Sequence, residues 1–150
     1  MEELVALLKE KKLTIASCES LTGGLFADSV VSISGASSVF VGALVTYATR
    51  IKHEVAQVDQ TLIDTNGVVS EEVASAMARN VARIMKSDIG VSFTGNAGPG
   101  VMEDKPAGLV YSAISYDSNI WVFEDHLQGT RTEIRCQVVE KMKSRLLQLL

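Results

Sequence analysis

Three short polar segments carry the residue types that acyl chemistry and anion binding require: a serine, a lysine and glycine-rich turns. Each segment follows an apolar run, and these runs (13–16, 39–45 and 89–93) are typical of buried strands. In an open α/β sheet, ligands bind beyond the carboxyl ends of the strands. We therefore predict that the segments form one composite site. They are Cys18-Glu19-Ser20-Leu21-Thr22-Gly23-Gly24, Tyr47-Ala48-Thr49-Arg50-Ile51-Lys52 and Thr94-Gly95-Asn96-Ala97-Gly98-Pro99-Gly100.

Ser20 is the candidate nucleophile or anion ligand of the first segment, at a strand-to-helix junction. A serine nucleophile needs a base to take its proton, and the sequence has no G-x-S-x-G elbow. Lys52 is the candidate base. Its pKa must then lie well below the reference value of about 10.4, which burial or a nearby cation can bring about. The structural alternatives are that Ser20 and Thr22 cap the next helix and that Lys52 is solvated.

The other candidate nucleophiles and bases are weaker. Cys18 is a rival nucleophile, but its place at the end of an apolar strand favours a small core residue. Thr49 stands one helical turn before Lys52, where it is a second hydroxyl partner for the amine. The two histidines, His53 and His126, are isolated and are interpreted as surface residues.

The glycine-rich segment 94–100 has backbone amides that can cradle an anion, although it lacks the dinucleotide and phosphate-loop spacings. Arg131 and Arg135 stand one turn apart and can grip a phosphate or carboxylate bidentately. Tyr47 can position a ring or donate a hydrogen bond. Each has a structural alternative: a turn-rich loop, a charged helix face and an aromatic residue at the rim of the core.

The composition of the 150 residues excludes several classes of function. A hydrophobic fraction of 47% and a charged fraction of 21% indicate one ordinary folded domain, 1–150, rather than disorder. A net charge of −4 argues against nonspecific nucleic-acid binding. No apolar run approaches the length of a membrane span, and the acidic start is unlike a secretory signal. With two cysteines and two histidines, neither a disulfide framework nor a zinc site is expected, and we expect a cytoplasmic protein without metal or cofactor.

Helical and strand patterns alternate early, and a hairpin comes late, which predicts an α/β fold: a three-layer α/β/α domain with a mixed, mostly parallel sheet. The run 39–46 lacks alternation and is expected to be a central strand covered on both faces. The stretch from 57 to 69 is expected to be irregular. Helices are expected over 2–11, about 25–33, 49–56, 71–86 (capped by Ser70) and from Thr130 onward, where Glu133 completes a capping box; strands are expected over 13–18, 39–46, 89–93, 108–116 and 120–127.

In their order and spacing, the motifs together resemble the C-terminal domain of the competence/damage-inducible protein family CinA, whose stand-alone members include nicotinamide-nucleotide amidohydrolases. The resemblance runs through nearly the whole chain. The matching motifs are Glu19-Ser20-x-Thr22-Gly23-Gly24, Gly35 with Ser37, Phe40-x-Gly42, Tyr47 with Lys52, Val69-Ser70-Glu71-Glu72-Val73-Ala74, Thr94-Gly95-x-Ala97-Gly98-Pro99-Gly100 and Gly129-x-Arg131-x-x-Ile134-Arg135.

The resemblance implies hydrolysis of the carboxamide of nicotinamide mononucleotide to the acid and ammonia, without a metal. It implies Ser20 as nucleophile, Lys52 as its base, and Thr94 with Tyr47 as supporting polar groups. An acyl-enzyme on Ser20 and direct attack by water with Lys52 as base are both open. The implied substrate-binding residues are Glu19, Thr22, Gly23, Gly24, Gly95, Asn96, Ala97, Gly98, Gly100, Arg131 and Arg135.

The chain departs from the family pattern on the segments expected to face the substrate. Leu21 replaces a usual cysteine, Ala48-Thr49 replace Ser-Asn, Asn96 replaces isoleucine, and Val101-Met102 replace further glycine. These departures leave a rival hypothesis: a catalytically weak nucleotide- or partner-binding module linked to competence or DNA damage. A pyridine nucleotide is the expected small-molecule partner, and a homo-oligomer is expected; no membrane or direct nucleic-acid partner is.

Overall fold

A computed structural model describes all of residues 1–150, and its helices and strands alternate as the sequence patterns predict. The helices are α1 (Glu2–Lys11), α2 (Leu25–Val31), α3 (Thr49–Glu54), α4 (Gln60–Asn66), α5 (Glu71–Met85) and α6 (Arg131–Leu149), with one short 3₁₀ turn (Ala36–Ser38). The strands are β1 (Ile15–Glu19), β2 (Phe40–Val45), β3 (Ile89–Gly95), β4 (Leu109–Tyr116) and β5 (Asn119–His126).

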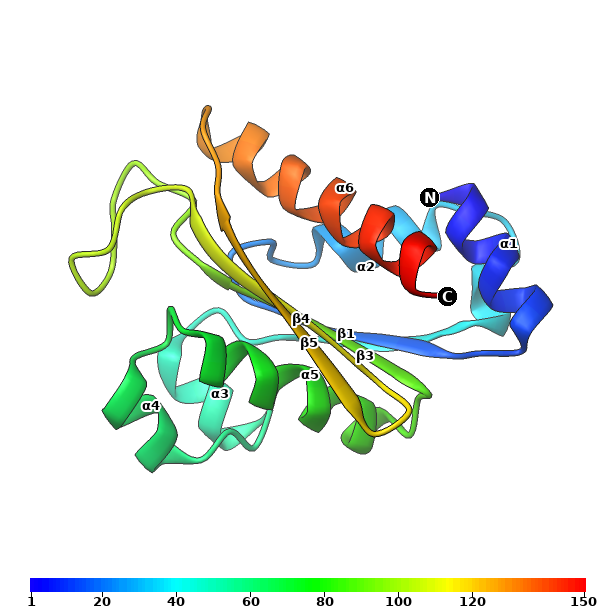
Figure 1. The fold of residues 1–150 in the computed structure, drawn as a ribbon, viewed down its shortest axis with the longest axis horizontal. Helices are drawn as coiled ribbons and strands as arrows, with labels where there is room; N and C mark the ends of the chain where they lie inside the picture. Colours follow the sequence, from blue (N-terminus) through cyan, green and yellow to red (C-terminus); the bar gives the residue numbers. More distant parts are fainter.

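The five strands form one mixed sheet in the order β2-β1-β3-β4-β5. The first three run parallel, and β4 and β5 add an antiparallel hairpin at the other edge. Helices α1, α2 and α6 cover one face, and α3, α4 and α5 cover the other (Figure 1). The predicted α/β/α architecture with a mixed sheet is confirmed.

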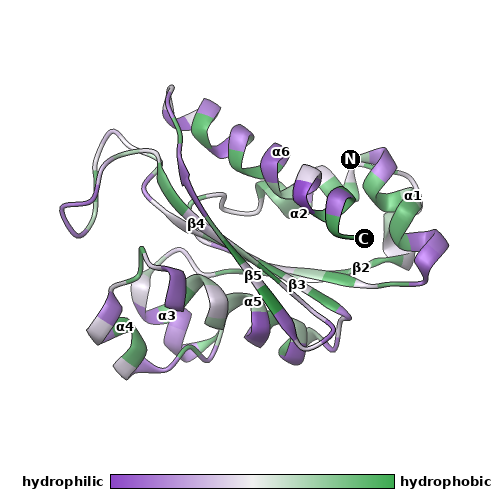
Figure 2. Ribbon diagram, in the orientation of Figure 1, coloured by the Kyte–Doolittle hydropathy of each residue, from purple (hydrophilic) through white to green (hydrophobic).

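The core lies on both faces of the central strands, because every residue of β1 and β3 is buried. The larger apolar cluster joins the sheet to α1, α2 and α6, and the second joins it to α4 and α5. Helices α5 and α6 carry hydrophilic and hydrophobic residues in alternation along their length (Figure 2), as helices with one covered face do. This packing fixes the strand ends that carry the three polar segments.

Two predicted helix starts have the expected caps. The Ser70 hydroxyl accepts a hydrogen bond from the Val73 amide at 3.3 Å. At the start of α6, Thr130 and Glu133 form both bonds of the capping box. These local bonds satisfy amide groups that a helix start leaves without partners.

Two sequence-based expectations about the elements are wrong. β2 is an edge strand rather than a central one, and its Val41 and Val45 are 45% and 49% exposed. An apolar run without alternation therefore does not distinguish a central strand from an edge strand. The stretch expected to be irregular contains α4, which Asp59 caps by accepting from the Thr61 amide at 2.8 Å.

None of the helices combines the length and the apolar composition that crossing a bilayer requires.

Candidate active site

The three polar segments meet at one edge of the sheet, because β1, β2 and β3 are adjacent and parallel. The Ser20 amide donates to the Phe93 carbonyl at 3.0 Å, which holds the end of β1 against β3. The Thr46 amide donates to the Glu19 carbonyl at 2.8 Å, which holds the end of β2 against β1. The edge is the crevice in which open α/β sheets bind ligands.

Lys52 and Ser20 are in direct contact at the centre of this edge. The Lys52 Nζ lies 3.0 Å from Ser20 Oγ and 2.9 Å from the Thr46 carbonyl oxygen. The lysine is only 1% exposed, so it is not the solvated lysine of the structural alternative. Burial lowers the pKa of Lys52, and the charge of Glu103 only partly opposes this. A buried amine with a lowered pKa beside a hydroxyl is suited to take the hydroxyl proton.

The rival nucleophile and bases do not share this position. Cys18 is fully buried in β1, and burial raises its pKa to about 12. The thiol therefore stays protonated at neutral pH and is not a nucleophile there. The ring Nδ1 of His53 lies 2.8 Å from the Val58 carbonyl oxygen, and His126 pairs with Glu124 on β5. Thr49 is exposed. Of the alternatives weighed from sequence, the geometry favours Ser20 with Lys52.

Glu19 lies directly before Ser20 but does not face the pocket. It is fully buried, and its carboxylate accepts from the amides of Gly24, Phe26 and Ala27 at 2.9–3.1 Å. The Ser17 hydroxyl donates to the same carboxylate at 3.0 Å. The structure thus assigns Glu19 to the start of α2, not to the substrate as the sequence suggested.

A pocket of about 150 Å³ opens beside Ser20. Tyr47 lies at its rim, 59% exposed. Arg131 spans the pocket edge, because its guanidinium donates to the Tyr47 hydroxyl at 2.7 Å and to the Gly98 carbonyl at 2.8 Å. The lining residues are Ser20, Leu21, Tyr47, Gly95, Asn96, Ala97, Gly100, Met102 and Arg131.

Comparison with known proteins identifies the family to which this arrangement belongs. The family model described as the CinA C-terminal domain matches residues 1–150. The chain belongs to the CinA C-terminal domain family. Proteins named "putative competence-damage inducible protein" are similar: one from Lactiplantibacillus plantarum is 45% identical over 125 residues, which is 83% of this chain and 30% of that protein. One from a Geobacillus species is 45% identical over 140 residues, or 93% of this chain and 34% of that protein.

This CinA domain spans about a third of the length of the curated relatives it matches. Solved structures of similar length share its fold. The competence/damage inducible protein CihA from Agrobacterium tumefaciens has a TM-score of 0.93 and 32% identity, over 99% of this chain and 94% of that one. A CinA superfamily protein from Escherichia coli has a TM-score of 0.93 and 27% identity, over 99% of this chain and 90% of that one.

Several residues that the sequence suggested for substrate binding instead shape the turn after Ser20. Arg135 donates from Nε to the Leu21 carbonyl at 3.0 Å and from its terminal nitrogen to the Thr22 carbonyl at 2.7 Å, so it fastens this turn to α6. Gly23 and Gly24 adopt positive φ angles, 57° and 97°, and their amides are bonded within the turn or to Glu19. Thr22 is fully buried, and its hydroxyl has no partner. None of these four lines the pocket.

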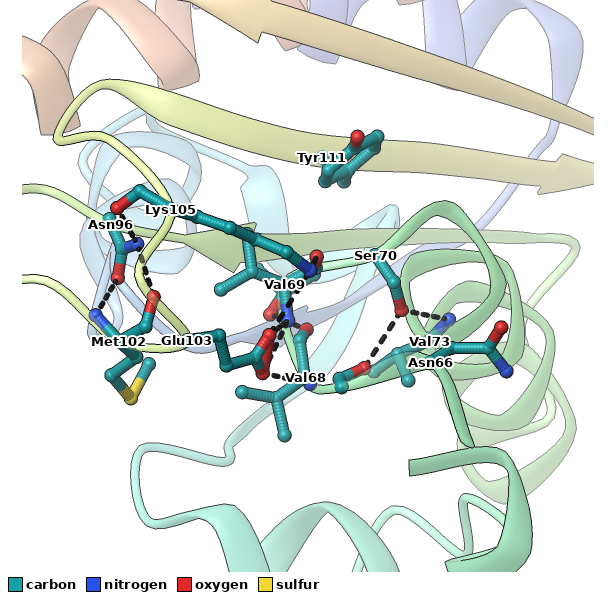
Figure 3. A network of polar contacts seen from close by, with 12 residues as sticks. Asn66, Val68, Val69, Ser70, Val73, Asn96, Met102, Glu103, Lys105 and Tyr111 are labelled. Carbon is teal, nitrogen blue, oxygen red and sulfur yellow. Dashed lines mark hydrogen bonds and ion pairs between the residues drawn. The ribbon is translucent and has the colours of Figure 1, made fainter. Parts of the chain in front are cut away.

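Thr94 and Asn96 are buried, and both bond to backbone groups in the CinA domain. The Thr94 hydroxyl donates to the Val68 carbonyl at 2.6 Å. The Asn96 amide accepts from the Met102 amide at 3.0 Å and donates to the Met102 and Lys105 carbonyls at 3.1 and 3.0 Å (Figure 3). The Asn96 side chain therefore closes the glycine-rich loop on itself, and both of its N–H donors are used within that loop.

Two backbone amides of the pocket are without partners. The amides of Leu21 and Ala97 belong to buried pocket residues and donate to no acceptor in the chain. Ala97 lies in the glycine-rich segment whose amides were expected to cradle an anion, whereas Leu21 was not among the expected binding residues. Its place directly after Ser20 is the signal that could have found it, because the residue after a nucleophile often supplies an oxyanion donor. Met102, which stands where the family pattern has further glycine, forms part of the pocket wall.

Proposed function

We propose that the chain is a nicotinamide-nucleotide amidohydrolase that converts nicotinamide mononucleotide into nicotinic acid mononucleotide and ammonia. The observation that carries this proposal is the 3.0 Å contact between the buried Lys52 amine and the Ser20 hydroxyl at the pocket. Membership of the CinA family supports the choice of a carboxamide, because the resemblance to that family implies this reaction.

The first step uses the neutral form of Lys52. One N–H donates to the Thr46 carbonyl, so the amine is held while its lone pair accepts the Ser20 hydroxyl proton. Ser20 Oγ forms a bond to the carboxamide carbon, and the carbonyl electron pair moves to oxygen. The unpaired amides of Leu21 and Ala97 are the donors we assign to this oxyanion.

The second step breaks the carbon–nitrogen bond. Protonated Lys52 returns its proton to the leaving nitrogen, ammonia departs, and an ester to Ser20 remains. A water molecule then attacks the ester carbon while Lys52 accepts one of its protons. The carbon–Oγ bond breaks, and Lys52 reprotonates Ser20. The acid product and the starting enzyme result.

The size of the pocket limits how much of the substrate it encloses. About 150 Å³ is less than the roughly 300–1,000 Å³ of pockets that hold drug-sized ligands. We therefore place the pyridine ring and its carboxamide in the pocket and the ribose phosphate at its mouth. Arg131 lies there with its Nε unbonded, and we assign this group to the phosphate.

Ammonia release from nicotinamide mononucleotide, measured for wild type, Ser20→Ala and Lys52→Ala, tests the proposal. We expect release by wild type and a loss of about 10²–10⁴-fold in Lys52→Ala, as for removal of a general base. Wild-type release no greater than that of the variants rejects the amidase. His53→Gln, which alters an exposed residue beside Lys52, is the matched control and is expected to retain activity.

The same variants separate the two mechanisms. An acyl-enzyme requires Ser20→Ala to be inactive and predicts that mass spectrometry of quenched wild type detects an ester on the peptide containing Ser20. Activity that persists in Ser20→Ala favours direct attack by water. Nucleotide binding without turnover by wild type favours the rival hypothesis, a binding module.

A further inference from the structure

The pocket loop, residues 96–108, is attached to the opposite side of the crevice by two charged side chains. The Glu103 carboxylate accepts from the Val68 amide and, at 3.3 Å, from the Val69 amide. Lys105 Nζ donates to the Val69 carbonyl and forms an ion pair with Glu103 at 3.2 Å. Figure 3 shows these contacts converging on the segment that precedes α5.

The segment that receives these contacts is itself bonded to the site. The Val68 carbonyl accepts the Thr94 hydroxyl at 2.6 Å, and Thr94 directly precedes Gly95 of the pocket. Val68 thus bonds to the pocket loop through its N–H and to β3 through its carbonyl. Because Met102, adjacent to Glu103, forms part of the pocket wall, this attachment fixes the wall relative to the strand ends.

We propose that Glu103 is a positioning residue that fastens the pocket loop to Val68 and Val69 and thereby holds Met102 in the wall beside Ser20. Its carboxylate is the only one that bonds these two amides. The backbone of Glu103 has a φ of 59°, an uncommon value that aims its side chain back across the crevice and that the bonds to Val68 and Val69 compensate.

The negative charge of Glu103 also acts on the base. Burial lowers the pKa of Lys52, and the charge of Glu103 on the pocket loop opposes this. Removal of the Glu103 carboxylate therefore lowers the pKa of Lys52 further. A loop anchor without this charge would not affect the titration of the base.

Glu103→Ala and Asp104→Ala form a matched pair that tests the inference. Asp104 is the next residue, has a similar φ of 53°, and its side chain makes no hydrogen bond or ion pair. Both variants lose one carboxylate at a left-handed position, but only Glu103→Ala loses the attachment. We expect faster hydrogen exchange of the Val68 and Val69 amides and a roughly tenfold higher KM, the equivalent of one charge-assisted bond, in Glu103→Ala alone.

Two further readouts distinguish positioning from general loss of structure. The acid limb of the pH profile of kcat/KM is expected to move to lower pH in Glu103→Ala. Glu103→Gln keeps one acceptor oxygen, so its KM is expected to lie between those of wild type and Glu103→Ala. If Glu103→Ala does not fold, Lys105→Met removes the other anchor and is expected to change exchange and KM in the same direction.

The inference rests on the proposed function only for its kinetic readouts. If wild type does not turn over nicotinamide mononucleotide, the amidase fails, while exchange of the Val68 and Val69 amides still tests the attachment. Equal exchange in Glu103→Ala, Asp104→Ala and wild type overturns the positioning role, whatever the activity. An unchanged KM and acid limb in an active Glu103→Ala also overturn it.

Discussion

Lys52 and Ser20 are 32 positions apart in the sequence, yet their side chains meet because of how β1 and β2 pair. Glu19 stands opposite Val45 in the parallel ladder, so the residues that follow, Ser20 and Thr46, leave the sheet side by side. The short helix α3 then turns Lys52 back to the Thr46 carbonyl. The lysine is thus held by the strand end next to the one that carries the serine.

Lys52→Arg tests whether the side chain must lose a proton. Arginine keeps the positive charge but stays protonated at any pH that the protein tolerates, so we expect a loss of about 10²–10⁴-fold in kcat. In wild type, activity is expected to rise with pH through a pKa lower than the 10.5 of an ordinary lysine, because burial favours the neutral amine. Steady-state rates across pH measure both effects. A flat profile in wild type would contradict the base assignment.

The sequence patterns were sufficient to predict the layers, the caps at Ser70 and Thr130, and the meeting of Ser20 with Lys52. They failed where the outcome depends on tertiary neighbours. β2 contacts both α2 and α5, yet its outer edge stays exposed, and the apolar run alone does not reveal that exposed edge. Asp59 at the start and Gly67 at the end are residue types that mark helix boundaries, and they bound α4.

The roles within the site were harder to predict than its location. Glu19 and Arg135 belong to matching motifs, yet both stabilise the turn around Ser20 through backbone bonds. A motif gives the positions that matter but not whether a side chain faces the ligand or the fold. The attachment of Glu103 to Val68 links residues 35 positions apart, and no local pattern encodes it.

Arg131→Met tests the assignment of the phosphate. The guanidinium joins Tyr47 to Gly98, and its loss removes a donor from the mouth of the pocket. We expect KM for nicotinamide mononucleotide to rise roughly 10–100-fold, with a smaller rise for nicotinamide riboside, which lacks the phosphate. Equal rises for the two substrates would place the phosphate elsewhere.

Glu19→Gln is expected to destabilise the fold. The substitution replaces one carboxylate oxygen by an amide N–H₂ beside backbone donors, and leaving such buried groups unpaired costs about 1–3 kcal/mol. Denaturant unfolding measures the change. Asp28→Asn also removes one negative charge, but at an exposed position of α2, and is expected to lower the free energy of unfolding by less than about 1 kcal/mol. Equal costs would refute the capping role of Glu19.

Arg145→Met is expected to weaken the protein in a pH-dependent way. Burial tends to raise the pKa of Asp125, but the bonds and charges of Arg145 and Lys141 outweigh it and lower the pKa. The stabilisation is complete above the unfolded-state pKa of about 3.9 and is lost as pH falls through the lower folded value. At pH 7 the variant is expected to lose about 3 kcal/mol of unfolding free energy, and the difference is expected to shrink in acid.

Urea unfolding at pH 7 and pH 3 measures this difference. The control is Arg50→Met, which breaks an exposed pair with Glu54 and is expected to cost no more than about 0.5 kcal/mol. A loss in Arg145→Met that does not depend on pH would show that packing on Phe123, not the charge of Asp125, is the main contribution.

Val41→Lys tests the expected homo-oligomer. The edge strand β2 has no charged residue and leaves Val41 and Val45 exposed, so pairing with β2 of a second copy would satisfy its backbone and cover these side chains. We predict dimers for wild type and monomers for the variant by sedimentation velocity. Val101→Lys, at an equally exposed valine away from the edge, is expected to leave the mass unchanged. A monomeric wild type would contradict this prediction.

The bonds of Arg135 to the Leu21 and Thr22 carbonyls make the turn after Ser20 depend on a helix that is more than a hundred positions away in the sequence. The contact of Lys52 with Ser20 instead depends on the pairing of β1 with β2, to which α6 contributes no residue. If α6 moved away from the sheet, the two carbonyls would lose their partners while Lys52 could stay beside Ser20. The two parts of the site are therefore expected to respond separately to changes in the packing of α6.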